Sequence, residues 1–275
     1  MDKLISVIMG IYNVEATLRE ALDCILAQTY TNWEVIMCDD GSADKTVEVA
    51  MEYVNKYPDK FVLIKNKTNQ GLNITLNNCL SKAKGEYIAR MDGDDTCSET
   101  RFAKQVEILD NNPDIAIVST DMLFFDESGV WGRTHVKPRP EKQHYLIDNV
   151  FCHAAAMVRR EAYMAVEGYT VDKRLLRVED YHLWAKMYAK GYTGVNIQEP
   201  LYQMRDDHAA FKRRKFRFRV NEAYATLCAC RLMEFPFYCR VYCLKPILKG
   251  LVPGFMYKYL HRRRLAKRIS DSSEG

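Results

Sequence analysis

The sequence has no hydrophobic run that could cross a membrane, and it has no recognisable secretion signal. The apolar run within residues 4–12 follows the acidic Asp2 and falls well short of the roughly 20 apolar residues that span a bilayer. The nine cysteines are scattered, and no two form a C-x-x-C pair. We therefore expect a cytoplasmic protein with reduced thiols, and the C-A-C at 228–230 lacks the usual zinc-site spacing.

The glycine-rich loops that bind nucleotide phosphates are also absent. The first expected strand-to-helix turn, GIYNVEA at 10–16, contains one glycine and no G-x-G-x-x-G, and the chain has no Walker loop. These absences disfavour a dinucleotide site of the usual kind. If a nucleotide binds, its phosphates need a metal ion or a basic side chain.

Charge is unevenly distributed along the chain. The net charge is +4, but residues 211–275 hold 16 Lys and Arg against 4 Asp and Glu, a surplus of +12. The other 210 residues hold 24 basic and 32 acidic residues, a balance of −8. This asymmetry predicts two parts with different tasks: a domain at 1–210 and a basic, helical C-terminal extension at 211–275.

Strand and helix patterns alternate through the first 120 residues. Short apolar runs that predict strands are separated by segments with apolar residues at helical spacing. The expected strands lie within 4–12, 33–42, 61–66 and 86–92, and the expected helices within 14–30, 43–57 and 72–84. This order predicts an α/β fold of Rossmann-like type, with a mostly parallel sheet flanked by helices on both faces.

Polar residues gather where three of these strands end. The first strand ends in Tyr12 and Asn13, the second in the segment 39–42, and the fourth in the segment 92–95. Ligands of parallel sheets bind beyond the carboxyl ends of the strands, so we expect one carboxylate-rich edge. Like charges this close repel one another. The aspartates of 92–95 therefore either fan out into water or hold a metal ion.

Five motifs, in this order and at this spacing, resemble the family 2 glycosyltransferases. They are SVIMGIYN, DDGSADKT, NQGL, GEYIARMDGDD and VEDYHLW, and the resemblance covers about residues 3 to 205. It implies the GT-A fold and an inverting enzyme that moves a sugar from a nucleotide-sugar, such as a UDP-sugar, to an acceptor hydroxyl. The Q-x-x-R-W signature of processive members is absent, which favours the addition of one sugar or a few.

The resemblance also implies roles for individual residues. Asp39 would bind the uracil ring, and Asp94 would hold Mg²⁺ or Mn²⁺ against the diphosphate. Asp180 would be the general base, with Glu179 beside it as the other candidate. The implied nucleotide-binding residues are Ile11, Tyr12, Asp39, Asn69, Gly71, Arg90 and Asp92, and the implied metal ligands are Asp94, Asp92 and His208.

Simpler explanations exist for most of these residues. The acidic turn at 92–95 could be solvated, and the segment 39–42 could cap the helix that follows. Asp180 could also be only a cap for its own helix. Asn69 and Gly71 suit an ordinary turn, and Tyr12 could belong to the core.

The basic extension leaves three alternatives. Its Lys and Arg are interleaved with aromatic and aliphatic residues, a pattern that suits an anionic membrane surface, nucleic acid, or a helical hairpin packed on the first domain. Since relatives in the family often glycosylate lipid-linked carriers, we expect peripheral attachment to the inner face of the membrane, and we expect no nucleic acid. Two other functions remain open: a catalytically silent nucleotide-sugar-binding or scaffold subunit, and a sugar nucleotidyltransferase. The nucleotidyltransferase would need a Gly-rich, basic N-terminal loop that the chain lacks.

Overall fold

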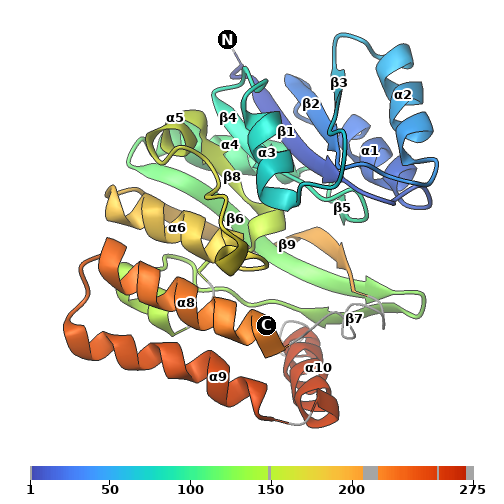
Figure 1. Cartoon of the computed structure of the whole chain (residues 1–275). Coiled ribbons are helices and arrows are strands. Elements are labelled where there is room, and N and C mark those ends of the chain that lie inside the picture. The colour runs from blue at the N-terminus through green and yellow to red at the C-terminus, as the bar shows by residue number, and fades with distance from the viewer. Residues whose placement is uncertain (1, 148–149, 207–215, 253, 271–275) are drawn as a thin grey trace.

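A computed structural model describes residues 2–147, 150–206, 216–252 and 254–270 (Figure 1). The first half contains β1 (Ile5–Ile11), α1 (Leu18–Leu26), β2 (Trp33–Asp39), α2 (Thr46–Lys56), β3 (Phe61–Lys65), α3 (Leu72–Leu80), β4 (Tyr87–Arg90), β5 (Thr96–Cys97), α4 (Arg101–Asn111) and β6 (Ile115–Asp126). The second half contains β7 (Gly129–Arg133), β8 (Met157–Arg159), α5 (Arg160–Ala165), α6 (Glu179–Ala189), β9 (Thr193–Arg205), α8 (Phe216–Leu232), the 3₁₀ helix η4 (Phe237–Cys243), α9 (Leu244–Gly250) and α10 (Gly254–Ser270).

The strands form one mixed sheet in the order β3-β2-β1-β4-β8-β6-β9-β5, with β7 paired to β6. The four strands that the sequence predicts, β1 to β4, are parallel to one another. Beyond β4 the pairing changes, because β8 runs antiparallel to both β4 and β6, whereas β9 is parallel to β6. The α/β class is confirmed. The parallel sheet that the sequence predicts occupies one half of the molecule, and the rest of the sheet is mixed.

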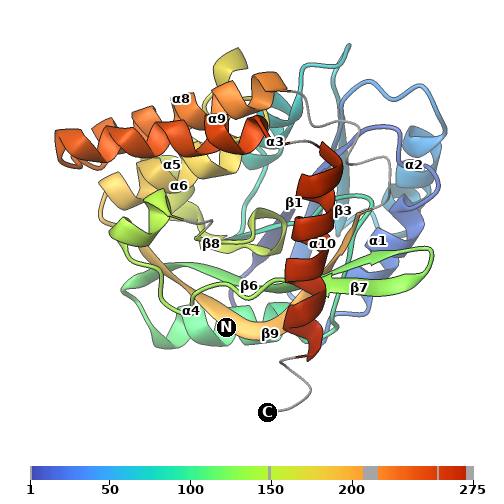
Figure 2. The same ribbon diagram turned by 90° about the horizontal axis from the view of Figure 1, so that it is seen from below.

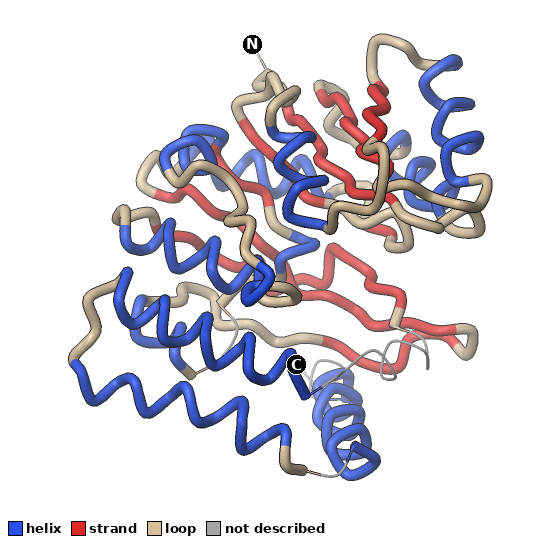
Figure 3. The backbone as a smooth tube through the Cα atoms, in the orientation of Figure 1, coloured by secondary structure: helices blue, strands red, loops and turns tan. Residues whose placement is uncertain are grey.

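Helices cover both faces of the sheet, as Figure 3 shows. Successive side chains of a strand point to opposite faces, so alternate residues of β1 enter two separate cores. Val7 and Met9 pack in the cluster that holds residues of α1, α2 and α4. Ile8 packs in the cluster that holds residues of α3, α5 and α6. This double burial explains why the central strands are apolar throughout.

The C-terminal helices pack on the rest of the molecule. Ala229 and Cys230 of α8 lie in the same buried cluster as Leu183 and Trp184 of α6. α10 lies against β7 (Figure 2), where Arg262 pairs with Asp126 at 3.1 Å.

In the described parts of the chain, no helix is both long and apolar enough to cross a membrane. The boundary between 1–210 and 211–275 stays a prediction.

Candidate functional site

The strand ends meet at one edge of the sheet. In the parallel pairing of β1 with β2, Ile11 lies beside Asp39, and the Asp40 N–H donates to the Ile11 carbonyl at 2.9 Å. β4 lies on the other side of β1, and the turn after β4 reaches the same edge, where Thr17 Oγ1 donates to the Gly93 carbonyl at 3.0 Å. The expected convergence of these loops is therefore present.

The two neighbouring aspartates at the end of β2 do different things. Asp40 is buried and holds the loop before α3: its carboxylate accepts from the Gln70 and Gly71 N–H groups at 2.8 and 2.9 Å. Asp39 is also buried, and it accepts longer bonds of 3.2 to 3.3 Å from the N–H groups of Gly41 and residue 42. Asp40 is thus committed to the backbone, whereas Asp39 is held more loosely at the edge.

The helix-cap explanation for the segment 39–42 is not what the structure shows. Ser42 Oγ accepts from the Asn13 N–H at 3.0 Å, on the loop after β1. The first turn of α2 is instead bound by Asp44, which accepts from the Thr46 N–H at 3.0 Å. Ser42 therefore joins two loops of the site. Gly41 allows their close approach to the loop before α3, because it has a φ of +79° and an added Cβ would lie 3.1 Å from the Asn69 nitrogen.

The other predicted nucleotide-binding residues differ in how far they are exposed to solvent. Tyr12 is 48% exposed at the end of β1, so its ring is accessible to a ligand and does not belong to the core. Ile11 is 1% exposed and its side chain belongs to the core, so only its backbone can face the edge. Asn69 is exposed. Gly71, with a φ of +90°, is held through its N–H to Asp40 at the start of α3.

Arg90 and Asp92 form a buried, bidentate ion pair. Arg90 is 3% exposed, and its Nη1 and Nη2 donate to the two carboxylate oxygens of Asp92 at 2.9 and 2.6 Å. Burial by itself lowers the pKa of Arg90, but the Asp92 carboxylate together with nearby tyrosines outweighs burial, and the pKa is raised. Arg90 therefore carries a fixed positive charge behind the acidic turn.

Asp95 organises the end of the acidic turn, a role that sequence reasoning missed. It is 2% exposed, accepts from Tyr202 Oη at 2.8 Å and from the Arg205 N–H at 2.8 Å, and so binds the turn to β9. Burial first, and then the charges of Asp92 and Asp94, raise its pKa well above the usual value. The partners lie 107 and 110 positions away in sequence, and no local signal identifies them.

The acidic turn suits a divalent cation only in part. Asp94 is half-buried and offers the hard carboxylate oxygens that Mg²⁺ and Mn²⁺ prefer. Both oxygens of Asp92 already accept from Arg90, which makes Asp92 the weaker donor. Within the described residues, no three His, Cys, Asp or Glu side chains gather closely enough to hold a metal ion. His208, the third predicted ligand, lies outside the described residues.

The second pair of predicted carboxylates begins α6. Burial, and then the neighbouring Asp180, raise the pKa of Glu179 to about 7. One of its oxygens, Oε2, is buried and has no hydrogen-bond partner among the described residues. Burial also raises the pKa of Asp180, although a bond of 2.8 Å from the Tyr181 N–H and the charge of Arg90 oppose the rise. The charge of Arg90 thus acts on this pair as well as on Asp92.

Asp180 lines a cavity of about 400 Å³. The cavity lies between α6 and the C-terminal helices, which stack beside one another in Figure 1. Glu222 and Thr226 of α8 and Lys245 and Lys249 of α9 form its far wall. Sequence reasoning did not connect the extension with Asp180, and the spacing of the motifs carries no signal for this wall.

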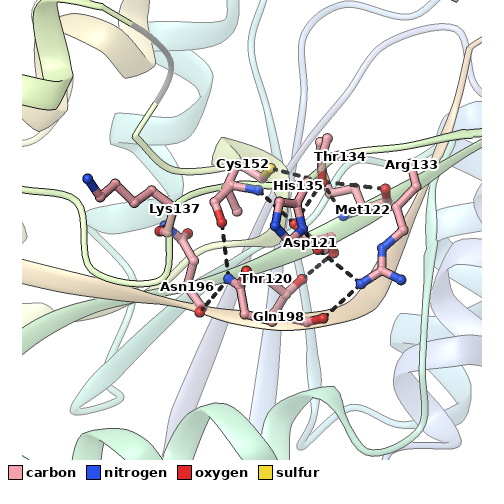
Figure 4. A network of polar contacts seen from close by, with 11 residues as sticks. Thr120, Asp121, Met122, Arg133, Thr134, His135, Lys137, Cys152, Asn196 and Gln198 are labelled. Carbon is pink, nitrogen blue, oxygen red and sulfur yellow. Dashed lines mark hydrogen bonds and ion pairs between the residues drawn. The ribbon is translucent and has the colours of Figure 1, made fainter. Parts of the chain in front are cut away.

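A separate polar network holds the second half of the sheet together (Figure 4). Asp121 of β6 is fully buried and accepts from the Val136 N–H at 2.9 Å and from Arg133 Nη2 at 3.1 Å. Asn196 of β9 donates to the carbonyls of Lys137 and residue 150 at 2.7 and 2.9 Å. These bonds fix the segment after β7 against β6 and β9, so the network is explained by the architecture.

Solved structures share this fold. TarS of S. aureus (residues 1–349) in complex with UDP superposes with a TM-score of 0.65 at 18% identity, covering 90% of this chain and 70% of that chain. The mannosyltransferase PcManGT of Pyrobaculum calidifontis, in complex with GDP-Man and Mn²⁺, superposes with a TM-score of 0.61 at 22% identity, covering 91% and 69%. The chain has the GT-A fold of these glycosyltransferases.

Sequence comparison identifies the family. Residues 6–166 match the model of glycosyl transferase family 2. The chain is 42% identical over 271 residues to the "Putative glycosyltransferase EpsE" of Bacillus subtilis (strain 168), covering 98% of this chain and 96% of the relative. It is 30% identical over 203 residues to WfaP of Escherichia coli, named as a UDP-Glc:alpha-D-GlcNAc-diphosphoundecaprenol beta-1,3-glucosyltransferase, covering 70% and 74%. The chain belongs to family 2 of the glycosyltransferases, as its motifs predict.

Proposed function

We propose that this chain transfers a sugar from a UDP-sugar to a hydroxyl group of a glycan or lipid-linked acceptor, with inversion at the anomeric carbon. The observation that carries this proposal is the division of the carboxylates into two centres, one paired directly with Arg90 and the other influenced only by its charge. The first, Asp92 and Asp94, lies at the strand ends; the second, Asp180, lines a cavity. Inverting transfer needs this division, because donor diphosphate and acceptor hydroxyl lie on opposite sides of the sugar.

The donor site would be the edge formed by the ends of β1, β2 and β4. The exposed ring of Tyr12 supplies a surface for the base, and the loosely held carboxylate of Asp39 supplies an acceptor for a base N–H. Arg90 fixes Asp92 in one orientation toward the edge. Two similar proteins support a nucleotide-sugar donor, since TarS is solved in complex with UDP and WfaP is named for UDP-Glc. The sugar would be a hexose or an N-acetylhexosamine.

The resident cation would be Mg²⁺ or Mn²⁺, held by Asp94 and the donor diphosphate, with Asp92 as an auxiliary ligand. When bound, such a cation offsets the negative charge that grows on the leaving diphosphate. The small number of protein ligands fits Mg²⁺, which needs one or two carboxylates in addition to substrate phosphates. Asp95 supports this site from behind, because its bonds to β9 fix the backbone of the acidic turn.

Asp180 is the better candidate for the general base. Asp180 lines a cavity that can hold an acceptor, whereas Glu179 does not line that cavity. A base must be ionised before it takes the acceptor proton, and a pKa raised by burial brings its basicity closer to the working pH. The positive charge of Arg90 keeps this pKa from rising further.

The basic extension supports attachment of the enzyme to the inner face of the membrane. Its surplus of +12 would attract an anionic leaflet, and a lipid-linked acceptor would be reached there. The name of WfaP, with its diphosphoundecaprenol acceptor, supports the same acceptor class.

Calorimetry with UDP, with and without Mn²⁺, tests the proposal. A catalytic donor site binds UDP in a metal-dependent manner and hydrolyses one UDP-sugar slowly without acceptor. A silent scaffold subunit binds UDP but hydrolyses no donor. A nucleotidyltransferase forms a nucleotide-sugar from a sugar phosphate and a nucleoside triphosphate, and the single glycine of GIYNVEA speaks against it.

A further inference from the structure

The cavity at Asp180 continues into an apolar groove on the C-terminal helices. The groove has a volume of about 560 Å³ and lies along η4 and α9. Tyr242, Lys245 and Lys249 line both the cavity and the groove, so these residues form the junction between them. A ligand could therefore extend from Asp180 across the junction and along α9.

The groove is lined by hydrophobic side chains that are open to solvent. Val241, Leu244 and Leu248 are 61%, 52% and 62% exposed. The opposite side of the same segment is packed, since Cys239 and Pro246 are buried. Exposed apolar side chains that form a continuous surface, rather than single scattered ones, indicate a site for an apolar partner.

The charges are arranged in a definite order along this path. Among the described residues, the lining of the groove contains no Asp or Glu, and its cations, Lys245 and Lys249, stand at the junction. Arg177 adds a third cation to the cavity wall. Glu222 is a second acid in the cavity besides Asp180, and its carboxylate accepts from Arg219 at 2.8 Å. From Asp180 outward, the path thus presents a base, then cations, then an apolar surface.

We propose that this cavity and groove bind the acceptor, and that the acceptor is a lipid diphosphate carrying a sugar. The inference rests on the proposed function for its direction: the sugar hydroxyl faces Asp180, the diphosphate lies between Lys245 and Lys249, and the hydrocarbon chain lies on Val241, Leu244 and Leu248. A soluble glycan would use the cavity but would leave the groove empty. A protein partner would not explain why the cations of the groove are confined to the junction.

The test uses farnesyl diphosphate as the probe, below its micelle-forming concentration, with the full chain and with UDP and Mg²⁺ at saturation. Calorimetry is expected to show binding that is roughly tenfold or more tighter than that of inorganic diphosphate or of farnesol alone, because each of these fills half of the path.

Two variants locate the site. Leu248→Glu places a charge in the groove and Lys249→Glu reverses a charge at the junction, and each should weaken farnesyl diphosphate binding roughly tenfold or more. Both side chains are exposed, so folding should be preserved. Met164→Glu, a change at a 45% exposed position on α5, is the matched control and should leave binding unchanged.

The outcomes separate this inference from the proposed function. Equal affinity for farnesyl diphosphate in the wild type, Leu248→Glu and Lys249→Glu would overturn the lipid site. So would equal affinity for inorganic and farnesyl diphosphate, because it would show that the apolar groove contributes nothing to binding. If neither the wild type nor any variant bound UDP, the proposed donor site would instead be contradicted. UDP binding is measured in the same titration, before the probe is added.

Discussion

Arg90 binds Asp92 through both of its terminal nitrogens, with Nη1 2.9 Å from Oδ2 and Nη2 2.6 Å from Oδ1. The guanidinium is buried, whereas the Asp92 side chain is 26% exposed. The same positive charge opposes the rise in the pKa of Glu179 and Asp180. One arginine therefore orients the acidic turn after β4 and acts electrostatically on the carboxylates at the start of α6.

Arg90→Gln should destabilise the protein and disorder the proposed donor site. Removing one member of a buried pair leaves the other charge without its partner, and we expect the free energy of unfolding to fall by about 2–4 kcal/mol. Urea denaturation measures this loss. Arg19→Gln is the control, because Arg19 and Glu52 form an exposed ion pair and their loss should change stability little. If the two substitutions lowered the free energy of unfolding equally, the buried Arg90 pair would contribute no more to stability than the exposed pair.

Asp94→Asn and Asp180→Asn should separate binding from turnover. Asp94→Asn removes the proposed main metal ligand, so it should weaken metal-dependent UDP binding and abolish transfer. Asp180→Asn should leave UDP and metal binding nearly intact and reduce turnover about 10²–10⁴-fold, the usual contribution of a general base. Calorimetry and a transfer assay measure the two effects. A normal transfer rate in Asp180→Asn would assign the base to Glu179 or another residue.

Glu179→Gln should stabilise the protein at high pH but not at low pH. The pKa of Glu179 is raised from 4.5 to about 7 in the folded state, so the folded protein holds the proton more tightly than the unfolded chain. Stability from this group is complete below the unfolded pKa and is lost as the pH rises from about 4.5 to about 7. At pH near 8 the substitution should raise the free energy of unfolding by up to about 3 kcal/mol, and near pH 4 it should have little effect.

Urea denaturation of the wild type and the variant at both pH values measures this difference. Glu161→Gln, on α5, controls for the loss of a carboxylate in the first turn of a helix. A stabilisation that is the same at both pH values would show that the buried carboxylate is not its source.

The sequence predicts the half of the molecule that holds the parallel strands well and the half that holds the C-terminal helices poorly, for a physical reason. The parallel strands and the meeting of their ends follow from local apolar runs and from the βαβ connection. Asp40 and Asp39 are adjacent and chemically identical, and only the tertiary contacts with Gly71 distinguish the backbone anchor from the ligand candidate. Asp95 and the cavity wall at Lys245 depend on partners far away in sequence, so periodicity and motif spacing cannot reveal them.

The full chain should bind anionic vesicles in a salt-dependent manner. Each Lys or Arg near an anionic leaflet contributes about 1 kcal/mol, so four or five contacts suffice to localise the protein, and salt screens the attraction over about 8 Å at physiological ionic strength. Not all of the +12 surplus is available, since Arg262 pairs with Asp126. Vesicle flotation at low and high salt, with neutral vesicles as the control, measures the effect. No flotation at low salt would reject membrane attachment.

A screen of nucleotide-sugars for slow hydrolysis without acceptor decides whether the chain is a metal-dependent transferase that uses a UDP-sugar. The release of nucleoside diphosphate is measured with Mn²⁺ and with a chelator, for the wild type and for Asp94→Asn. We predict that a UDP-sugar is hydrolysed by the wild type in the presence of Mn²⁺, and that the chelator and Asp94→Asn each abolish the release. Release that persists with the chelator, or a complete absence of release together with no binding of UDP, would contradict this function.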